Sequence, residues 1–162
     1  MVDIKNIMQI IILYCHSKGY TINPLKLQKL LYFVQAWHIV AFNKKTLFQE
    51  LPEAWVNGPV YRSIYDVFKT DFYRNERLYI NYTEEELHNE LDESVSKSGL
   101  TTEQQEVLFD VLKIYGAMSD EKLVFATHKA EPWNNARKGC KPFERCNKLI
   151  SVDDMYNYYS QK

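Results

Sequence analysis

The stretch NPLKLQKLLYFVQAWHIVAF, residues 23–42, decides how the rest of the chain is arranged. Asn23 is a good helix N-cap and Pro24 suits the first helical position, so a helix is predicted from Leu25 to Phe42. Projected at about 100° per residue, its apolar side chains fill most of the circumference. A helix that is apolar nearly all round is buried by neighbours on several sides. We therefore expect this helix to lie at the centre of the fold.

Length and composition predict one intracellular domain. The chain has 162 residues, 46% hydrophobic and 14% aromatic, enough to form a core without metal or disulfides. Its net charge of −1 creates no overall attraction for nucleic acid, and the apolar run at 10–13 is too short to span a membrane. Cys15, Cys140 and Cys146 form no CxxC pair. We interpret them as belonging to the reducing cytoplasm rather than to a disulfide framework.

Helices are also predicted on both sides of the central one. Asp3 caps a first helix that runs to about Lys18 and ends at Gly19. In the Asn57-Gly58-Pro59 turn, Pro59 is expected to start another helix. This helix is expected to continue over residues 60–69. Further helices are predicted over residues 102–115, 119–127 and 131–139 and from 152. Thr83/Glu86 and Thr102/Gln105 each fit a capping box.

Only short β segments are expected. Residues 47–56 contain Pro52 and are interpreted as an irregular extended segment or a short edge strand. Residues 77–82 alternate as a short strand does. The acidic region 83–99 is interpreted as a solvated connector, with a short acidic helix as the alternative. The sequence thus predicts a mainly α single domain over 1–162, a helical bundle around one buried central helix with one or two short β segments.

Two glutamines stand where the pattern predicts burial. Gln28 and Gln35 are seven residues apart, so they lie on one line of the central helix among apolar neighbours. Buried amides need hydrogen-bond partners, so one interpretation is that both hold backbone groups of an irregular segment, with Glu53–Gly58 as the candidate. The alternative is that both face water through a gap.

Motifs for common metal or catalytic chemistry are missing from the sequence. It has no HExxH, no paired Cys or His at zinc spacing and no GxSxG elbow. Gly58 stands without the glycine run of a phosphate loop. His38 lies in the apolar arc of the central helix, where a hydrogen-bonded core histidine is favoured over a ligand. We therefore predict no catalytic residue, no metal and no cofactor, and favour a protein that is not an enzyme.

Two charged runs are candidate partner surfaces. The basic run comprises Arg137, Lys138, Lys141, Arg145 and Lys148, opposed only by Glu144. It is either a solvated loop or an electropositive patch for an acidic partner or for phosphates. The acidic run Glu84–Glu93 either holds a basic partner or lies against the basic run within the chain.

The central helix, the Asn57-Gly58-Pro59 turn and the residues around Trp133 together give the sequence a resemblance to a known family. It resembles the Panacea domain family, also called the SocA-like or GepA-like (phage-associated protein) family. The matching blocks are residues 27–33, Gln35, Trp37, Glu53-Ala54-Trp55, Gly58-Pro59-Val60, Tyr65, Phe68, Thr127-His128, Pro132-Trp133 and Ala136-Arg137. They stand in family order and cover roughly residues 4–138. Residues 83–99 and the C-terminal part, a loop and a short helix over 139–162, match no family motif.

The resemblance implies a mainly α-helical cytoplasmic antitoxin of bacteria or their phages. Members neutralise a cognate toxin by direct binding, and at least one mode presents the toxin to a AAA+ protease as an adaptor. No catalytic residue carries over. The residues that we expect to form a structural polar cluster are Gln28, Gln35, Glu53, Trp55, Gly58, Pro59, His128, Trp133 and Arg137.

Toxin contacts are expected at exposed charged and tyrosine side chains. These are Glu84, Glu85, Lys138, Lys141, Arg145, Tyr79, Tyr82, Tyr156, Tyr158 and Tyr159. Two other functions are kept as alternatives. One is a DNA-binding autoregulator of a toxin–antitoxin operon that uses the basic run, and the other is a hydrolase that uses His128.

Overall fold

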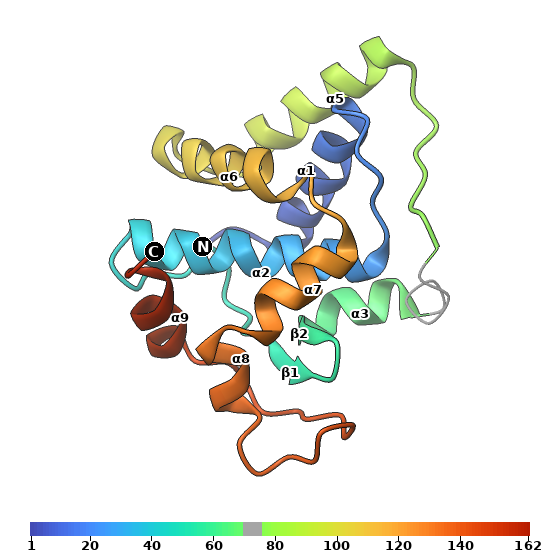
Figure 1. Cartoon of the computed structure of the whole chain (residues 1–162). Helices are drawn as coiled ribbons and strands as arrows, with labels where there is room; N and C mark the ends of the chain where they lie inside the picture. The colour runs from blue at the N-terminus through green and yellow to red at the C-terminus, as the bar shows by residue number, and fades with distance from the viewer. Residues whose placement is uncertain (70–75) are drawn as a thin grey trace.

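Helix α2 (Pro24–Ala41) runs through the middle of the molecule (Figure 1). The structure is a computed structural model that describes residues 1–69 and 76–162. Asn23 caps α2 by accepting a hydrogen bond from the Lys26 N–H at 2.8 Å. Fourteen of the 18 residues of α2 are buried, because α1, α6, α7, α9 and β2 pack around it. The prediction of a buried central helix is confirmed.

The fold is a mainly α single domain with one small sheet, as predicted. Around α2, the described elements are α1 (Ile4–Ser17), β1 (Glu53–Trp55), β2 (Gly58–Val60), α3 (Arg62–Val67), α5 (Glu84–Lys97), α6 (Thr102–Tyr115), α7 (Asp120–His128), α8 (Glu131–Ala136) and α9 (Val152–Tyr159). In Figure 1, α1, α5 and α6 lie above α2, whereas the hairpin, α8 and α9 lie below it. None of the helices in the described part of the chain has the length and apolarity needed to cross a membrane.

Strands β1 and β2 form an antiparallel hairpin with Ala54 opposite Pro59 and Trp55 opposite Gly58. Gly58 has a φ of +109°, which residues with a side chain rarely adopt. Because Pro59 is paired within β2, it cannot start a helix, and α3 begins only at Arg62. The predicted helix start at residues 59–60 is therefore wrong.

The region 76–99 differs from the sequence-based expectation. Residues 77–82 form no strand. Leu78 is instead tied by its N–H to the Ile22 carbonyl at 2.8 Å and by its carbonyl to His16 Nε2 at 2.9 Å. The favoured connector is also wrong, because α5 extends to Lys97 and packs along α1, with Leu91 and Val95 against the core.

Helix α6 begins one residue away from the predicted capping box. Thr101, rather than Thr102, is the N-cap, and Gln104 supplies the reciprocal bond. The Thr101 hydroxyl accepts from the Gln104 N–H at 3.1 Å, and Gln104 Oε1 accepts from the Thr101 N–H at 3.0 Å. The sequence TTEQQ, residues 101–105, contains two overlapping capping boxes, and the structure uses the first of them.

Candidate functional site

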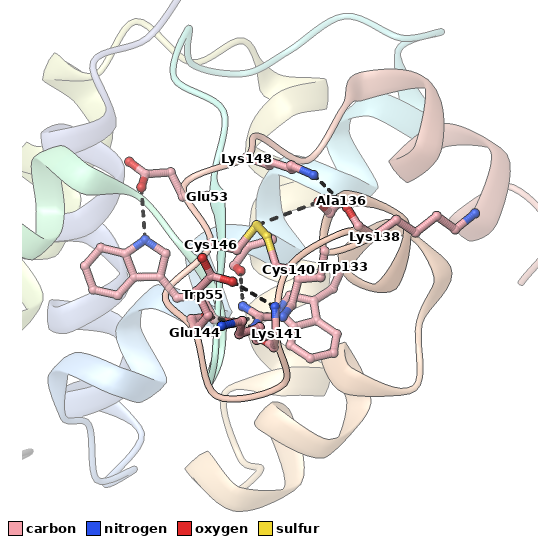
Figure 2. Close-up of a disulfide and its surroundings, with 12 residues drawn as sticks. Glu53, Trp55, Trp133, Ala136, Lys138, Cys140, Lys141, Glu144, Cys146 and Lys148 are labelled. Atoms are coloured by element: carbon pink, nitrogen blue, oxygen red, sulfur yellow. Dashed lines mark hydrogen bonds between the residues drawn. A yellow bond between two sulfur atoms is a disulfide. The ribbon is translucent and has the colours of Figure 1, made fainter.

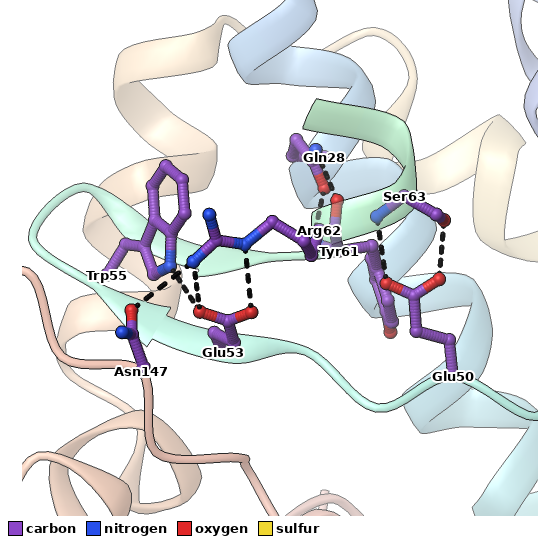
Figure 3. Close-up of polar contacts among 8 residues, drawn as sticks. All are labelled: Gln28, Glu50, Glu53, Trp55, Tyr61, Arg62, Ser63 and Asn147. Atoms are coloured by element: carbon purple, nitrogen blue, oxygen red, sulfur yellow. Dashed lines mark hydrogen bonds and ion pairs between the residues drawn. The ribbon is translucent and has the colours of Figure 1, made fainter. Parts of the chain in front are cut away.

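The two buried glutamines of α2 each hold one backbone segment with both ends of the amide. Gln28 accepts from the Tyr61 N–H at 2.8 Å and donates to the Tyr61 carbonyl at 3.2 Å (Figure 3). Gln35 accepts from the Leu47 N–H and donates to the Phe48 carbonyl, both at 2.7 Å. Both side chains are buried, so they do not face water. Their partners flank the hairpin rather than lying within Glu53–Gly58.

Lys29, beside Gln28, is fully buried and points at the same hairpin. Its ammonium donates to the Pro59 carbonyl at 3.0 Å. A Cβ on Gly58 would stand 2.6 Å from Lys29 Cε and 2.8 Å from the Thr127 hydroxyl, so only glycine fits between α2 and α7. Burial lowers the pKa of Lys29 to about 7. The predicted cluster did not include this lysine.

Trp133 and His128 hold the far side of the hairpin. The Trp133 indole donates to the Trp55 carbonyl at 2.8 Å, and the His128 ring stacks on Trp133 with centroids 4.2 Å apart. Burial lowers the pKa of His128, although a hydrogen bond with the Val56 backbone acts the other way. His128 Nε2 is buried and forms no hydrogen bond to a hydroxyl or thiol among the described residues. A hydrolytic base would need such a contact with its nucleophile.

Arg137 links the hairpin to the loop that follows α8. Its buried guanidinium donates to the carbonyl of Ala54 in β1 at 2.7 Å. It also donates to the loop carbonyls of Lys141 at 2.8 Å and Glu144 at 2.7 Å, while lying over the Trp133 ring. This member of the predicted basic run is therefore used inside the fold.

A disulfide between Cys140 and Cys146 closes the same loop (Figure 2). The expectation that the cysteines form no disulfide is wrong for this pair, and Cys15 is the free, buried cysteine of the described residues. The Glu144 carboxylate accepts from the Lys141 N–H at 2.8 Å, and the resulting turn brings the two cysteine Cα atoms to 6.1 Å. A six-residue spacing does not reveal this turn.

Glu53 organises a charged cluster on the outer side of β1. Its carboxylate accepts from Arg62 at 3.1 and 3.2 Å and from the Trp55 indole at 3.0 Å (Figure 3). Partial burial acts to raise the pKa of Glu53, but these hydrogen bonds outweigh it and lower the pKa. The Arg145 guanidinium lies over the Trp55 ring, 3.9 Å from the ring centroid.

The predicted toxin-contact residues do not form one surface. Glu84 and Glu85 are in the first turn of α5, whereas Lys138, Lys141 and Arg145 lie after α8, at the opposite end of the molecule (Figure 1). The acidic run therefore does not lie against the basic run. Among the predicted exposed tyrosines, Tyr79 and Tyr82 are exposed, but Tyr159 is buried against α2.

His38 is a hydrogen-bonded core histidine, as favoured from the sequence. Its Nδ1 lies 2.7 Å from the Lys45 carbonyl and its Nε2 lies 3.2 Å from the Gln104 amide. Burial lowers its pKa. Within residues 1–69 and 76–162, no three His, Cys, Asp or Glu side chains are grouped as metal ligands.

The sequence model of the family described as "Antitoxin SocA-like, Panacea domain" matches residues 27–134. The chain belongs to this family. The match covers two thirds of the sequence and includes most of α2, the hairpin and the start of α8. No curated protein and no solved structure matches the chain significantly.

The family match of this SocA-like domain spans the residues that hold the hairpin, except Arg137. Sequence reasoning missed Lys29, Tyr61 and Arg62 as members of this arrangement. For Lys29 the sequence carried no distinguishing signal. The partner of Lys29 is the backbone carbonyl of Pro59, and a pattern of residue types does not indicate which backbone carbonyl will accept a hydrogen bond.

Proposed function

We propose that this chain is the antitoxin of a toxin–antitoxin pair and neutralises its cognate toxin by direct binding. The observation that carries the proposal is the match to the SocA-like antitoxin family over residues 27–134. Gln28, Lys29 and Trp133, within that match, bond backbone carbonyls, so their polar groups serve the scaffold. Such a scaffold supports recognition by the surface around it.

The experiment uses the open reading frame that adjoins this gene. Inducing the neighbour alone arrests growth, and co-expressing this chain restores it. The two proteins co-purify at a Kd of about 1 μM or tighter, which corresponds to about −8 kcal/mol. Gln28→Leu, which leaves the buried Tyr61 N–H without the Gln28 oxygen as its acceptor, serves as a folding-defective control. Restored growth without a complex would contradict direct binding.

We place the pair in the cytoplasm and propose direct neutralisation rather than delivery to a AAA+ protease. The two mechanisms differ in the fate of the toxin. Under direct neutralisation, the toxin accumulates as a stable complex and its half-life is the same in strains with and without the protease. A toxin half-life that shortens only when both this chain and the protease are present would identify an adaptor instead.

A further inference from the structure

An apolar groove crosses the C-terminal half of α2. It consists of two hollows of about 270 and 330 Å³ that share Trp37 and Tyr115. The first lies between α2 and α6, with Val40 and Ile114 in its wall, and the second continues to Tyr158 in α9. Figure 1 shows α6 and α9 on opposite sides of this part of α2.

The floor of the groove is fixed and has few unused polar atoms. The Trp37 indole donates to the Tyr115 hydroxyl at 3.0 Å. The Tyr115 ring stacks on Phe33 with centroids 4.1 Å apart. At the rim, large apolar side chains remain in water: Ile114 is 60% exposed and Phe125, beside the second hollow, is 65% exposed. A preformed apolar surface of this kind is typical of a protein-docking site.

The two hollows carry opposite charges. Asp110 borders the first, whereas Lys129 and Lys162 border the second. The two ammonium groups lie over aromatic rings, Lys129 over Phe125 at 5.4 Å and Lys162 over Tyr158 at 4.6 Å. Within the described part of the chain, none of the three charges forms a salt bridge. The groove is therefore complementary to a partner that is acidic at one end and basic at the other.

We infer that this groove is the docking site for an amphipathic helix of the cognate toxin, which rests on the proposed function. The groove walls come from helices, whose backbone hydrogen bonds are made internally, so an added strand would find no edge to pair with. A helix fits because its apolar face contacts the Trp37–Tyr115 floor. Its acidic residues face Lys129 and Lys162, and a basic residue faces Asp110.

The test measures binding of the full-length chain to the protein from the adjoining open reading frame. Ile114→Glu puts a charge in the apolar wall, and the double variant Lys129→Glu/Lys162→Glu reverses the basic end. Phe143→Glu is the matched control, because Phe143 is 91% exposed and lies in the Cys140–Cys146 loop. All these positions are exposed or at a groove rim, and thermal unfolding verifies that each variant folds.

We expect both groove variants to weaken binding by about tenfold or more, and the control to change it by less than about twofold. Replacing the acidic residues of the toxin helix by lysine restores binding to the double variant. If the wild type binds and the groove variants bind equally well, the groove inference is overturned while the proposed function stands. If the wild type does not bind, both fail. A dimer of this chain that Ile114→Glu dissociates would assign the groove to self-association and also overturn the inference.

Discussion

Gly58 is a position of the hairpin that lies directly against side chains of both α2 and α7. Its φ of +109° is strained for any other residue, and an added Cβ would collide with Lys29 and Thr127. Gly58→Ala is therefore expected to lower the free energy of unfolding by about 2 kcal/mol or more. Urea denaturation measures this change. Gly99→Ala is the matched control, because Gly99 also has a positive φ, +81°, but has no atom within 4 Å of its added Cβ. Equal losses at the two positions would show that the collision is unimportant.

The burial of Lys29 is expected to make the free energy of unfolding rise with pH above neutrality. Burial lowers its pKa to about 7, whereas the unfolded chain keeps the ordinary value near 10.5. Between these values the unfolded state binds more protons, so raising the pH stabilises the folded state, by up to about 1.4 kcal/mol per unit. Urea midpoints from pH 7 to 8.5 measure this, below the range where Cys15, with its pKa raised to about 11, acts in the opposite direction.

Lys29→Met is the control for this slope. Methionine fills a similar volume without a titrating group, so the increase in stability between pH 7 and 8.5 is lost. The variant also leaves the Pro59 carbonyl without its 3.0 Å donor, which lowers stability equally at each pH of that interval. A slope that persists in Lys29→Met would have to come from another residue.

Residue patterns singled out the two amides, with burial and exposure to water both left open, but did not single out the buried ammonium. Gln28 and Gln35 stood out because uncharged amides on an apolar line have few other uses. Lys29, on the same helix, was indistinguishable from a lysine that extends to water. What distinguishes it is the Pro59 carbonyl, 30 residues away in the chain, which only the folded hairpin brings within reach.

At the level of elements, the helices around the core were predictable and their connections were less so. The N-caps Asp3, Asn23 and Ser119 each accept a backbone hydrogen bond as their sequences indicate. Helix α5 was misjudged because its acidic composition suggested a solvated segment, although Leu91 and Val95 stand four residues apart on one helical face. The prediction for residues 83–99 followed their acidic composition, whereas the four-residue spacing of the two apolar side chains indicated a packed helix.

Arg137 is predicted to couple the hairpin to the loop after α8. Arg137→Leu removes the donor of four carbonyls, and is expected to destabilise the protein by about 2–4 kcal/mol. Hydrogen exchange provides a local readout, because the Ala54 N–H donates to the Lys148 carbonyl where the loop returns to β1. Its protection falls more than that of the α2 amides. Lys138→Gln, at an exposed neighbour, leaves it unchanged.

Arg137→Lys separates the effect of charge from that of geometry. A lysine keeps the charge, but its single ammonium cannot donate to the Ala54, Lys141 and Glu144 carbonyls at once, as the planar guanidinium does. We expect it to recover less than half of the loss. Full recovery would mean that a buried charge alone, rather than the forked set of bonds, joins the hairpin to the loop.

At the scale of the whole molecule, the contacts made by the basic run argue against the DNA-binding alternative. One interpretation of the basic run is a patch that contacts phosphates. In the structure, however, Arg137 is buried, Lys148 donates to the Lys138 carbonyl at 2.6 Å and Arg145 lies over Trp55. Three of the five cations thus stabilise the loop that carries them. The net charge of −1 adds no long-range attraction.

We therefore predict that the chain alone binds the DNA upstream of its gene no more tightly than the non-specific range, a Kd of about 10⁻⁴–10⁻⁶ M. Fluorescence anisotropy with a labelled duplex at two salt concentrations measures this. Lys138→Glu/Lys141→Glu, which reverses two exposed cations of the run, leaves toxin neutralisation intact, because the groove over Trp37 and Tyr115 lies on other elements. Submicromolar, salt-sensitive binding that this variant abolishes would instead make the loop a phosphate-contacting surface.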